Sequence, residues 1–190
     1  MLKVERVQAT VNAVTPVAKK MGNSGAYETA MAINLIFITN AAHLDELDKG
    51  LRKTLYKKMS KAKKQEVIEE GEEQGDLLPN DNGDLTVPKF GKKLMTIGWD
   101  DELIGYMLVA GSGLTATEPR GMEDVKLKNF TITAQDGGTV KIQCTASFEC
   151  ERESKGWWCE QLRSTIELSL IPPGESQTEA FEEEEAEEVE

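Results

Sequence analysis

Alternating apolar and polar residues run through much of this chain and predict β-strands. From residue 2 to 11 the apolar residues stand at every second position, apart from one irregularity at Glu5-Arg6 that predicts a β-bulge. The run from Ala30 to Thr39 is apolar on both faces, as expected of a strand in the middle of a sheet. A turn-like segment, MGNSGAY, separates the two runs, so we expect them to pair antiparallel.

Helical spacing replaces the alternation after residue 40. Four leucines recur at intervals of three and four residues and mark one apolar helix face: Leu44, Leu47, Leu51 and Leu55. Gly50 interrupts this pattern, which favours two short helices over one longer helix. The segment of about residues 58–84 is highly charged and rich in turn residues, and we expect a mobile connector there.

The second half of the chain predicts hairpins. Residues 92–99 and 103–110 flank the polar triplet Asp100-Asp101-Glu102, which predicts a three-residue hairpin loop. Residues 124–134 and 139–150 flank Gln135-Asp136-Gly137-Gly138, where glycine supplies the positive φ that a tight turn requires. Each pair is therefore expected to form an antiparallel hairpin.

A short helix and a final strand complete the expected elements. The helix spans Ser154 to Arg163, and the strand after it ends at Pro172-Pro173, since proline cannot donate to a sheet ladder. With about seven strands and two helical segments, we expect one β-rich α+β domain over residues 1–173. The alternatives for its architecture are an antiparallel barrel, OB-like among the barrels, or a sandwich.

The acidity of the chain is concentrated at its end. Nine of the 34 acidic residues lie between Glu175 and Glu190, where there is no basic residue. Residues 1–174 carry 25 acidic and 22 basic residues, so the body is nearly neutral. A run of like charges with few apolar residues cannot bury a core, and we expect residues 174–190 to be a disordered acidic tail.

Catalytic and metal-binding constellations are nearly all missing from the sequence. His43 is the only histidine, so a two-histidine metal site cannot form, and its place at a helix start favours a surface role over catalysis. Asp100, Asp101 and Glu102 are expected to be solvated at a loop tip rather than to bind a cation. We expect no catalytic residue, no metal and no cofactor.

Three features favour the cytosol. The first residues alternate between polar and apolar, unlike the charged region and apolar run of a signal peptide. No stretch approaches roughly 18 consecutive apolar residues, so neither a transmembrane helix nor a membrane partner is expected. The three cysteines, Cys144, Cys150 and Cys159, are too few for a disulfide framework and fit reduced thiols.

Basic and aromatic residues interleave in the β-rich half, beginning at Lys89-Phe90. Single-stranded nucleic acid is held by cations that contact phosphates and by aromatic rings that stack on bases. The segment from Arg52 to Lys64 adds seven basic residues without an acidic one, and we expect its helix to contact phosphates or to be a solvated helix end. An ordinary exposed strand face is the alternative for the β half. The candidate phosphate contacts are Lys53, Lys57, Lys58, Lys92, Lys93, Lys126 and Lys128, and the candidate stacking residues are Trp99, Tyr106, Phe130 and Trp158.

The acidic tail suits a regulatory role. It can occupy a basic groove until a nucleic-acid strand displaces it, and the displaced tail is then free to recruit basic partner proteins. A solubilising disordered end is the alternative. The expected partner-binding residues are Phe181, Glu182, Glu183, Glu184, Glu185, Glu187, Glu188, Val189 and Glu190.

The stretches DVKLKNFTITAQDGGTVKIQCTASFE, GWWCEQLRS and IELSLIPP resemble a group of small bacteriophage and prophage proteins. ATVNAVTP and LDELDKGLRKTLYKK extend this resemblance over much of residues 1–173, with motifs that are structural rather than catalytic. The general plan, a β-rich body with an acidic tail, resembles phage single-stranded DNA-binding proteins, although this tail ends in Val-Glu instead of the apolar tip of bacterial single-strand binders.

The basic and aromatic residues, the acidic tail and the likeness in general plan together favour a single-stranded DNA-binding protein of the bacterial host cytoplasm, acting in phage replication or recombination through partners recruited by the tail. Two other classes stay open. One is a phage protein-interaction factor, either an inhibitor of a host protein or a DNA mimic, which would bind a basic protein and no DNA. The other is a virion assembly component, which would form a defined homo-oligomer.

Overall fold

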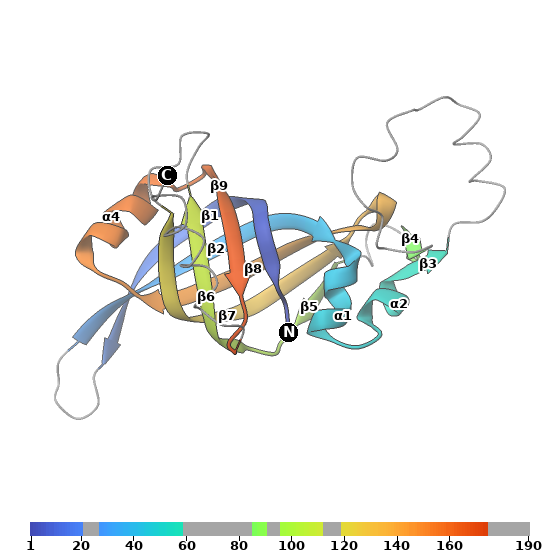
Figure 1. Cartoon of the computed structure of the whole chain (residues 1–190), viewed down its shortest axis with the longest axis horizontal. Helices are drawn as coiled ribbons and strands as arrows, with labels where there is room; N and C mark the ends of the chain where they lie inside the picture. Colours follow the sequence, from blue (N-terminus) through green and yellow to red (C-terminus); the bar gives the residue numbers. More distant parts are fainter. Residues whose placement is uncertain (21–26, 59–84, 91–95, 112–118, 175–190) are drawn as a thin grey trace, which may run out of the picture.

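The computed structural model describes residues 1–20, 27–58, 85–90, 96–111 and 119–174 (Figure 1). The longer strands are β1 (Val4–Lys20), β2 (Tyr27–Asn40), β6 (Leu103–Gly111), β7 (Arg120–Ala134), β8 (Thr139–Glu149) and β9 (Thr165–Ile171). The short strands are β3 (Tyr56–Lys58), β4 (Leu85–Pro88) and β5 (Thr96–Trp99). The helical elements are η1 (Ala41–His43), α1 (Leu44–Leu47), α2 (Leu51–Leu55), η3 (Asp136–Gly138) and α4 (Arg152–Glu160).

The longer strands close into an antiparallel barrel. Their order is β7-β6-β9-β1-β2-β8, and β8 pairs back with β7 to complete the ring. Each pairing around the ring is antiparallel. The expected β-rich α+β fold is confirmed, with the barrel rather than the sandwich as its form. It is OB-like in being a small closed antiparallel barrel with few short helices.

The N-terminal half of the barrel follows the sequence pattern closely. β1 and β2 pair antiparallel, with Ala9 opposite Phe37 and Val11 opposite Leu35. The register between β1 and β9 shifts between Val4 and Val7, where Arg6 has a φ of 48°. An extra residue in a left-handed conformation is the geometry of a β-bulge, so the irregularity predicted at Glu5-Arg6 is confirmed.

The core lies inside the barrel. Alternation turns Ile33, Leu35 and Phe37 of β2 inward, where they are fully buried, and similar rows from the other strands meet them. Burial of a side chain of this size contributes about 1.5–3 kcal/mol. β2 is a central strand, as expected, because it pairs with both β1 and β8. Its second apolar face points outward and ends in Ile38, which is 53% exposed.

One of the two predicted hairpins forms and the other does not. β7 and β8 are joined through η3, where Gly137 and Gly138 have φ values of 79° and 74°, so the turn expected at Gln135–Gly138 is confirmed. The hairpin expected around Asp100-Asp101-Glu102 is wrong, because β5 and β6 do not pair with each other. Both pair with β7 instead, one after the other along its length.

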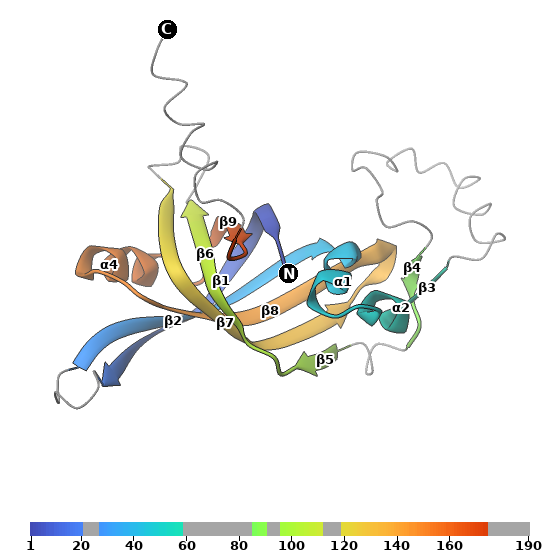
Figure 2. The same ribbon diagram turned by 60° about the horizontal axis from the view of Figure 1, so that its bottom comes forward.

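Short helices and the β3–β4 pair lie at one end of the barrel, beyond the β7–β8 turn (Figures 1 and 2). α1 and α2 are separated at Gly50, which has a φ of 98°, so the prediction of two short helices is confirmed. The predicted continuation of a basic helix beyond residue 55 is wrong over residues 56–58, which form β3. Residues 59–84, assigned to the connector, lie outside the described residues, as do residues 175–190.

Helix α4 lies at the opposite end of the barrel, near the start of β7 (Figure 1). Trp158 of this helix is fully buried and packs against Phe148 of β8, with ring centroids 5.7 Å apart. Trp157 beside it is half-buried and has the Arg120 guanidinium 5.6 Å from its ring centroid. The short helix predicted after residue 153 is thus confirmed, and its inner face anchors it to the barrel.

A candidate nucleic-acid interface

Lys126 and Lys128 lie on the outer face of β7, as their spacing predicts. The residues that alternate with them, Val125 and Leu127, are fully buried inside the barrel. Lys126 forms an ion pair with Glu102, from the segment between β5 and β6. Lys128 has no ion pair within the part of the chain that the structure describes. Of these two cations, Lys128 is therefore the one whose charge a ligand can use.

A third lysine on this face, Lys141 of β8, was not among the sequence candidates. It lies opposite Thr133 of β7 on one side and Ile38 of β2 on the other. Lys141 also lacks an ion pair among the described residues. The alternation in TVKIQC, with Val140, Ile142 and Cys144 pointing inward, is the signal that would have placed Lys141 outward.

Uncharged side chains cover the face between the two lysines, with polar residues on β7 and β8 and the apolar Ile36 and Ile38 beside them on β2. Asn34 of β2 accepts hydrogen bonds through Oδ1 from Gln143 Nε2 of β8 and from Asn12 Nδ2 of β1, each at 3.1 Å. Thr145 lies opposite Lys128, and Thr131 lies opposite Gln143. No carboxylate occurs within residues 125–134, 139–148 and 30–39 of the three strands.

The geometry of this face suits an extended polar ligand. Lys128 is opposite Thr145, which lies four positions from Lys141 on β8, so the two lysines are separated by about 13 Å along the sheet at roughly 3.3 Å per residue. Hydroxyl and amide groups between them can both donate and accept hydrogen bonds. Cations at both ends and neutral hydrogen-bonding groups between them favour an anionic, chain-like ligand over a small molecule.

Three of the four predicted stacking residues are buried. Tyr106, Phe130 and Trp158 lie in the core, so none offers a ring face to a ligand and their assignment as stacking residues is wrong. Trp99, the fourth, is half-buried and packs edge-on against Phe130, with ring centroids 5.0 Å apart.

A bulge explains why Phe130 points inward. Strict alternation would place it outward with Lys126 and Lys128, but the β7–β8 register shifts between Lys128 and Thr131. Asn129 has a φ of 55° at this point and is exposed. One extra residue moves every later side chain to the other face of the strand, which carries Phe130 into the core.

The remaining predicted lysines lie at the β7–β8 turn end of the barrel or outside the described residues. Lys53 of α2 and Lys57 and Lys58 of β3 are exposed. Lys92 and Lys93 lie outside the described residues, and so do all nine tail residues assigned to partner binding. The structure therefore brings Lys128 and Lys141 together on one face, with a second group of lysines beyond the hairpin turn.

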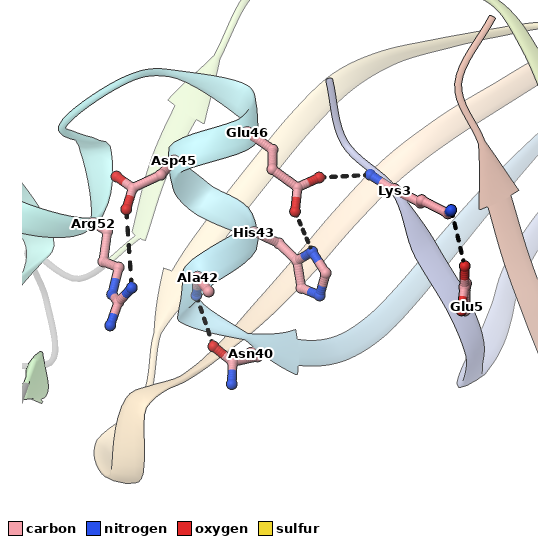
Figure 3. Close-up of polar contacts among 8 residues, drawn as sticks. All are labelled: Lys3, Glu5, Asn40, Ala42, His43, Asp45, Glu46 and Arg52. Atoms are coloured by element: carbon pink, nitrogen blue, oxygen red, sulfur yellow. Dashed lines mark hydrogen bonds and ion pairs between the residues drawn. The ribbon is translucent and has the colours of Figure 1, made fainter. Parts of the chain in front are cut away.

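The groups that could support chemistry are few. His43 Nδ1 lies 2.9 Å from Glu46 Oε1, and Glu46 Oε2 accepts a hydrogen bond of 2.7 Å from the backbone N–H of Lys3 (Figure 3). These contacts tie α1 to the start of β1. Cys144, Cys150 and Cys159 are all free thiols. Among the described residues, no group of three or more histidine, cysteine, aspartate or glutamate side chains could hold a metal ion.

Comparison of the chain with protein-family models, with curated proteins and with solved structures finds no match. In the described part of the chain, no helix is long and apolar enough to cross a membrane.

Proposed function

We propose that this protein binds single-stranded DNA across the outer face of β2, β8 and β7. The observation that supports the proposal is the position of Lys128 and Lys141, two lysines without ion pairs at either end of a polar strip that carries no carboxylate. Lysine side chains neutralise phosphates, which supplies sequence-independent affinity. Closed barrels of OB type bind oligonucleotides on their strand faces.

The polar strip has the chemistry of a path for a single strand. Thr131, Gln143 and Thr145 lie between the two lysines, and their side chains can hydrogen-bond to sugars or base edges. Lys53 and Lys57 extend the cationic path past the β7–β8 turn. With four lysines contacting phosphates, log K is expected to fall with log salt at a slope of about −3.

The acidic tail gives this binding a regulator. Its nine glutamates would compete with DNA for the same lysines, and DNA would release the tail for basic proteins of phage replication or recombination in the host cytoplasm. A single segment would thus link occupancy by DNA to recruitment of partners. The acidity of the chain would oppose DNA binding through the tail and not through the body, because residues 1–174 are nearly neutral.

Fluorescence anisotropy of a labelled oligothymidine tests the proposal. The full chain is titrated into the oligonucleotide at about 50 and about 200 mM salt, and we expect binding that weakens with salt at the stated slope. A folded chain that binds no oligothymidine at either concentration would refute the proposal. Capture of a basic protein by that same chain would then favour the protein-interaction factor, and a defined assembly in solution would favour the virion component.

A further inference from the structure

Phe90 carries the most exposed aromatic ring among the side chains that the structure describes. Its side chain is 45% exposed, whereas Trp99 and Trp157 are half-buried and the other described rings lie in the core. An exposed phenylalanine keeps an aromatic face in contact with water, where it is available to stack on a ligand.

The backbone that carries Phe90 is fixed in place. The N–H of Lys89 donates a hydrogen bond of 2.8 Å to the carbonyl of Leu55, at the end of α2. Pro88 lies opposite Tyr56 in the β3–β4 pair, and the Tyr56 hydroxyl donates to the carbonyl of Thr139. The segment that carries the ring is therefore anchored at the β7–β8 turn. Of Lys128 and Lys141, Lys141 lies closer to this end of the barrel.

Lysines lie on the short elements that carry and adjoin Phe90. Lys89 Nζ donates to the backbone carbonyl of Lys53, which places the Lys89 ammonium beside α2. Lys57 is exposed on β3, opposite Val87 of β4. The described residues 51–58 and 85–90 contain no carboxylate. In the described part of the chain, two acidic groups from neighbouring elements reach this region: Asp45 lies 4.0 Å from Arg52, and Asp136 of η3 lies near Tyr56.

We infer that Phe90 stacks on a base of the bound single strand while Lys53, Lys57 and Lys89 contact its phosphates. An exposed ring among cations is the combination that holds single-stranded nucleic acid without regard to sequence. This inference rests on the proposed function, and it supplies the stacking contact that Tyr106, Phe130 and Trp158 cannot make.

The inference is tested by measuring how substitutions at Phe90 change the affinity for two different oligonucleotides. Phe90→Ala and Phe90→Leu are each expected to weaken binding of oligothymidine by about 5- to 100-fold, the range for loss of one stacked base, and Phe90→Trp is expected to retain it. With an oligonucleotide of abasic sites, which has phosphates and no bases, Phe90→Ala should bind as well as the unaltered chain. Leu162→Ala is the matched control, because Leu162 is 47% exposed and follows α4 at the other end of the barrel.

The fluorescence of Phe90→Trp gives a second readout. Stacking of the introduced indole on a base should quench its emission during titration with oligothymidine, after subtraction of the signal from the unaltered chain. Unchanged affinity of Phe90→Ala and Phe90→Leu, together with loss of binding when Lys128 and Lys141 are replaced, would overturn the stacking role and leave the proposed function standing. Absence of binding by the unaltered chain would overturn both. If Phe90→Ala loses affinity equally for oligothymidine and for the abasic oligonucleotide, Phe90 has a structural role, and this result would also overturn the inference.

Discussion

Tyr56 donates its hydroxyl hydrogen to the backbone carbonyl of Thr139, a residue 83 positions further along the chain. The same hydroxyl accepts a hydrogen bond of 3.1 Å from the N–H of Gln135, on the other side of the hairpin turn. One buried side chain thus joins β3 to both strands of the β7–β8 hairpin. The contact positions the lysines of α2 and β3 beside the strands that carry Lys128 and Lys141.

Replacing Tyr56 with phenylalanine should loosen this junction. Tyr56→Phe removes the hydroxyl, while the Gln135 N–H and the Thr139 carbonyl keep their hydrogen bond of 3.0 Å to each other, so the free energy of unfolding is expected to fall by about 1 kcal/mol. Urea denaturation measures the change. Lys57→Ala, at the next and exposed position, is the control and is expected to change stability by less than about 0.5 kcal/mol. Equal stability of Tyr56→Phe and the unaltered chain would show that the hydroxyl contacts do not fix the junction.

The buried thiol of Cys144 should make stability fall at alkaline pH. Burial raises the pKa of Cys144 from 9.0 to about 12, so the folded chain keeps a proton that the unfolded chain loses. This contribution is fully present below pH 9 and is lost as the pH rises toward 12, at up to about 1.4 kcal/mol per pH unit.

Urea denaturation at several pH values between 8 and 10.5 isolates this contribution. The difference in stability between the unaltered chain and Cys144→Ala should shrink as the pH rises. Ile142→Val, a substitution of a buried and non-titrating neighbour on β8, should keep a constant difference over the same range. A constant difference for Cys144→Ala as well would contradict the assignment.

The β7–β8 turn contains two glycines with a positive φ, of which Gly137 is exposed. Gly137 has a φ of 79°, which an L side chain adopts at a cost of about 1–2 kcal/mol, so Gly137→Ala should destabilise the fold by that amount. Gly98→Ala is the matched control, because Gly98 has no positive φ and an added Cβ there meets no atom within 4 Å. Thermal unfolding of both variants compares them directly. A Gly137→Ala variant as stable as Gly98→Ala would mean that the turn tolerates a side chain.

Alternation along the sequence predicted most of the strands and the antiparallel pairs β1–β2 and β7–β8, because burial on one face is a local and periodic constraint, and it left barrel and sandwich open as architectures. It could not predict where that period breaks in the middle of a strand. The bulge at Asn129 turns Phe130 inward, and β6 has register shifts on both sides of Tyr106, which is buried as well. Sequence reasoning placed both rings at the surface because they interleave with basic residues, a pattern that does not reveal these irregularities.

The local sequence pattern also could not predict which of the other strands pair with each other. The triplet Asp100-Asp101-Glu102 has the composition of a hairpin loop, yet β5 continues along β7 ahead of β6. Which strand lies beside another depends on closure of the whole barrel, which no short segment encodes. The candidate site was predictable only in part for the same reason. The alternation of residues on β7 predicts that Lys126 and Lys128 point outward. The ion pair between Lys126 and Glu102 depends on how distant segments fold together, which the local pattern does not show.

Removal of the acidic tail should strengthen binding of DNA. A chain ending at Gly174 lacks nine glutamates that compete for the lysines, so its affinity for oligothymidine should rise at low salt and approach that of the full chain at high salt. Anisotropy titrations of the two chains at both salt concentrations make the comparison. Equal affinities of the two chains at low salt would contradict the proposed competition between tail and DNA. They would not contradict DNA binding by the barrel.

The most direct test of the account replaces the two lysines on which it rests. In Lys128→Gln/Lys141→Gln both cations are lost from the outer face of β7 and β8, and Lys155→Gln on α4, at one end of the barrel, is the control. Oligothymidine affinity is measured for both variants and the unaltered chain over a series of salt concentrations. We predict that the double variant binds oligothymidine at least about 10-fold more weakly than the unaltered chain, and that the control binds like the unaltered chain. The slope of log K against log salt should be smaller in size by about 1.4 for the double variant. Equal affinity and an equal slope for the double variant would contradict it.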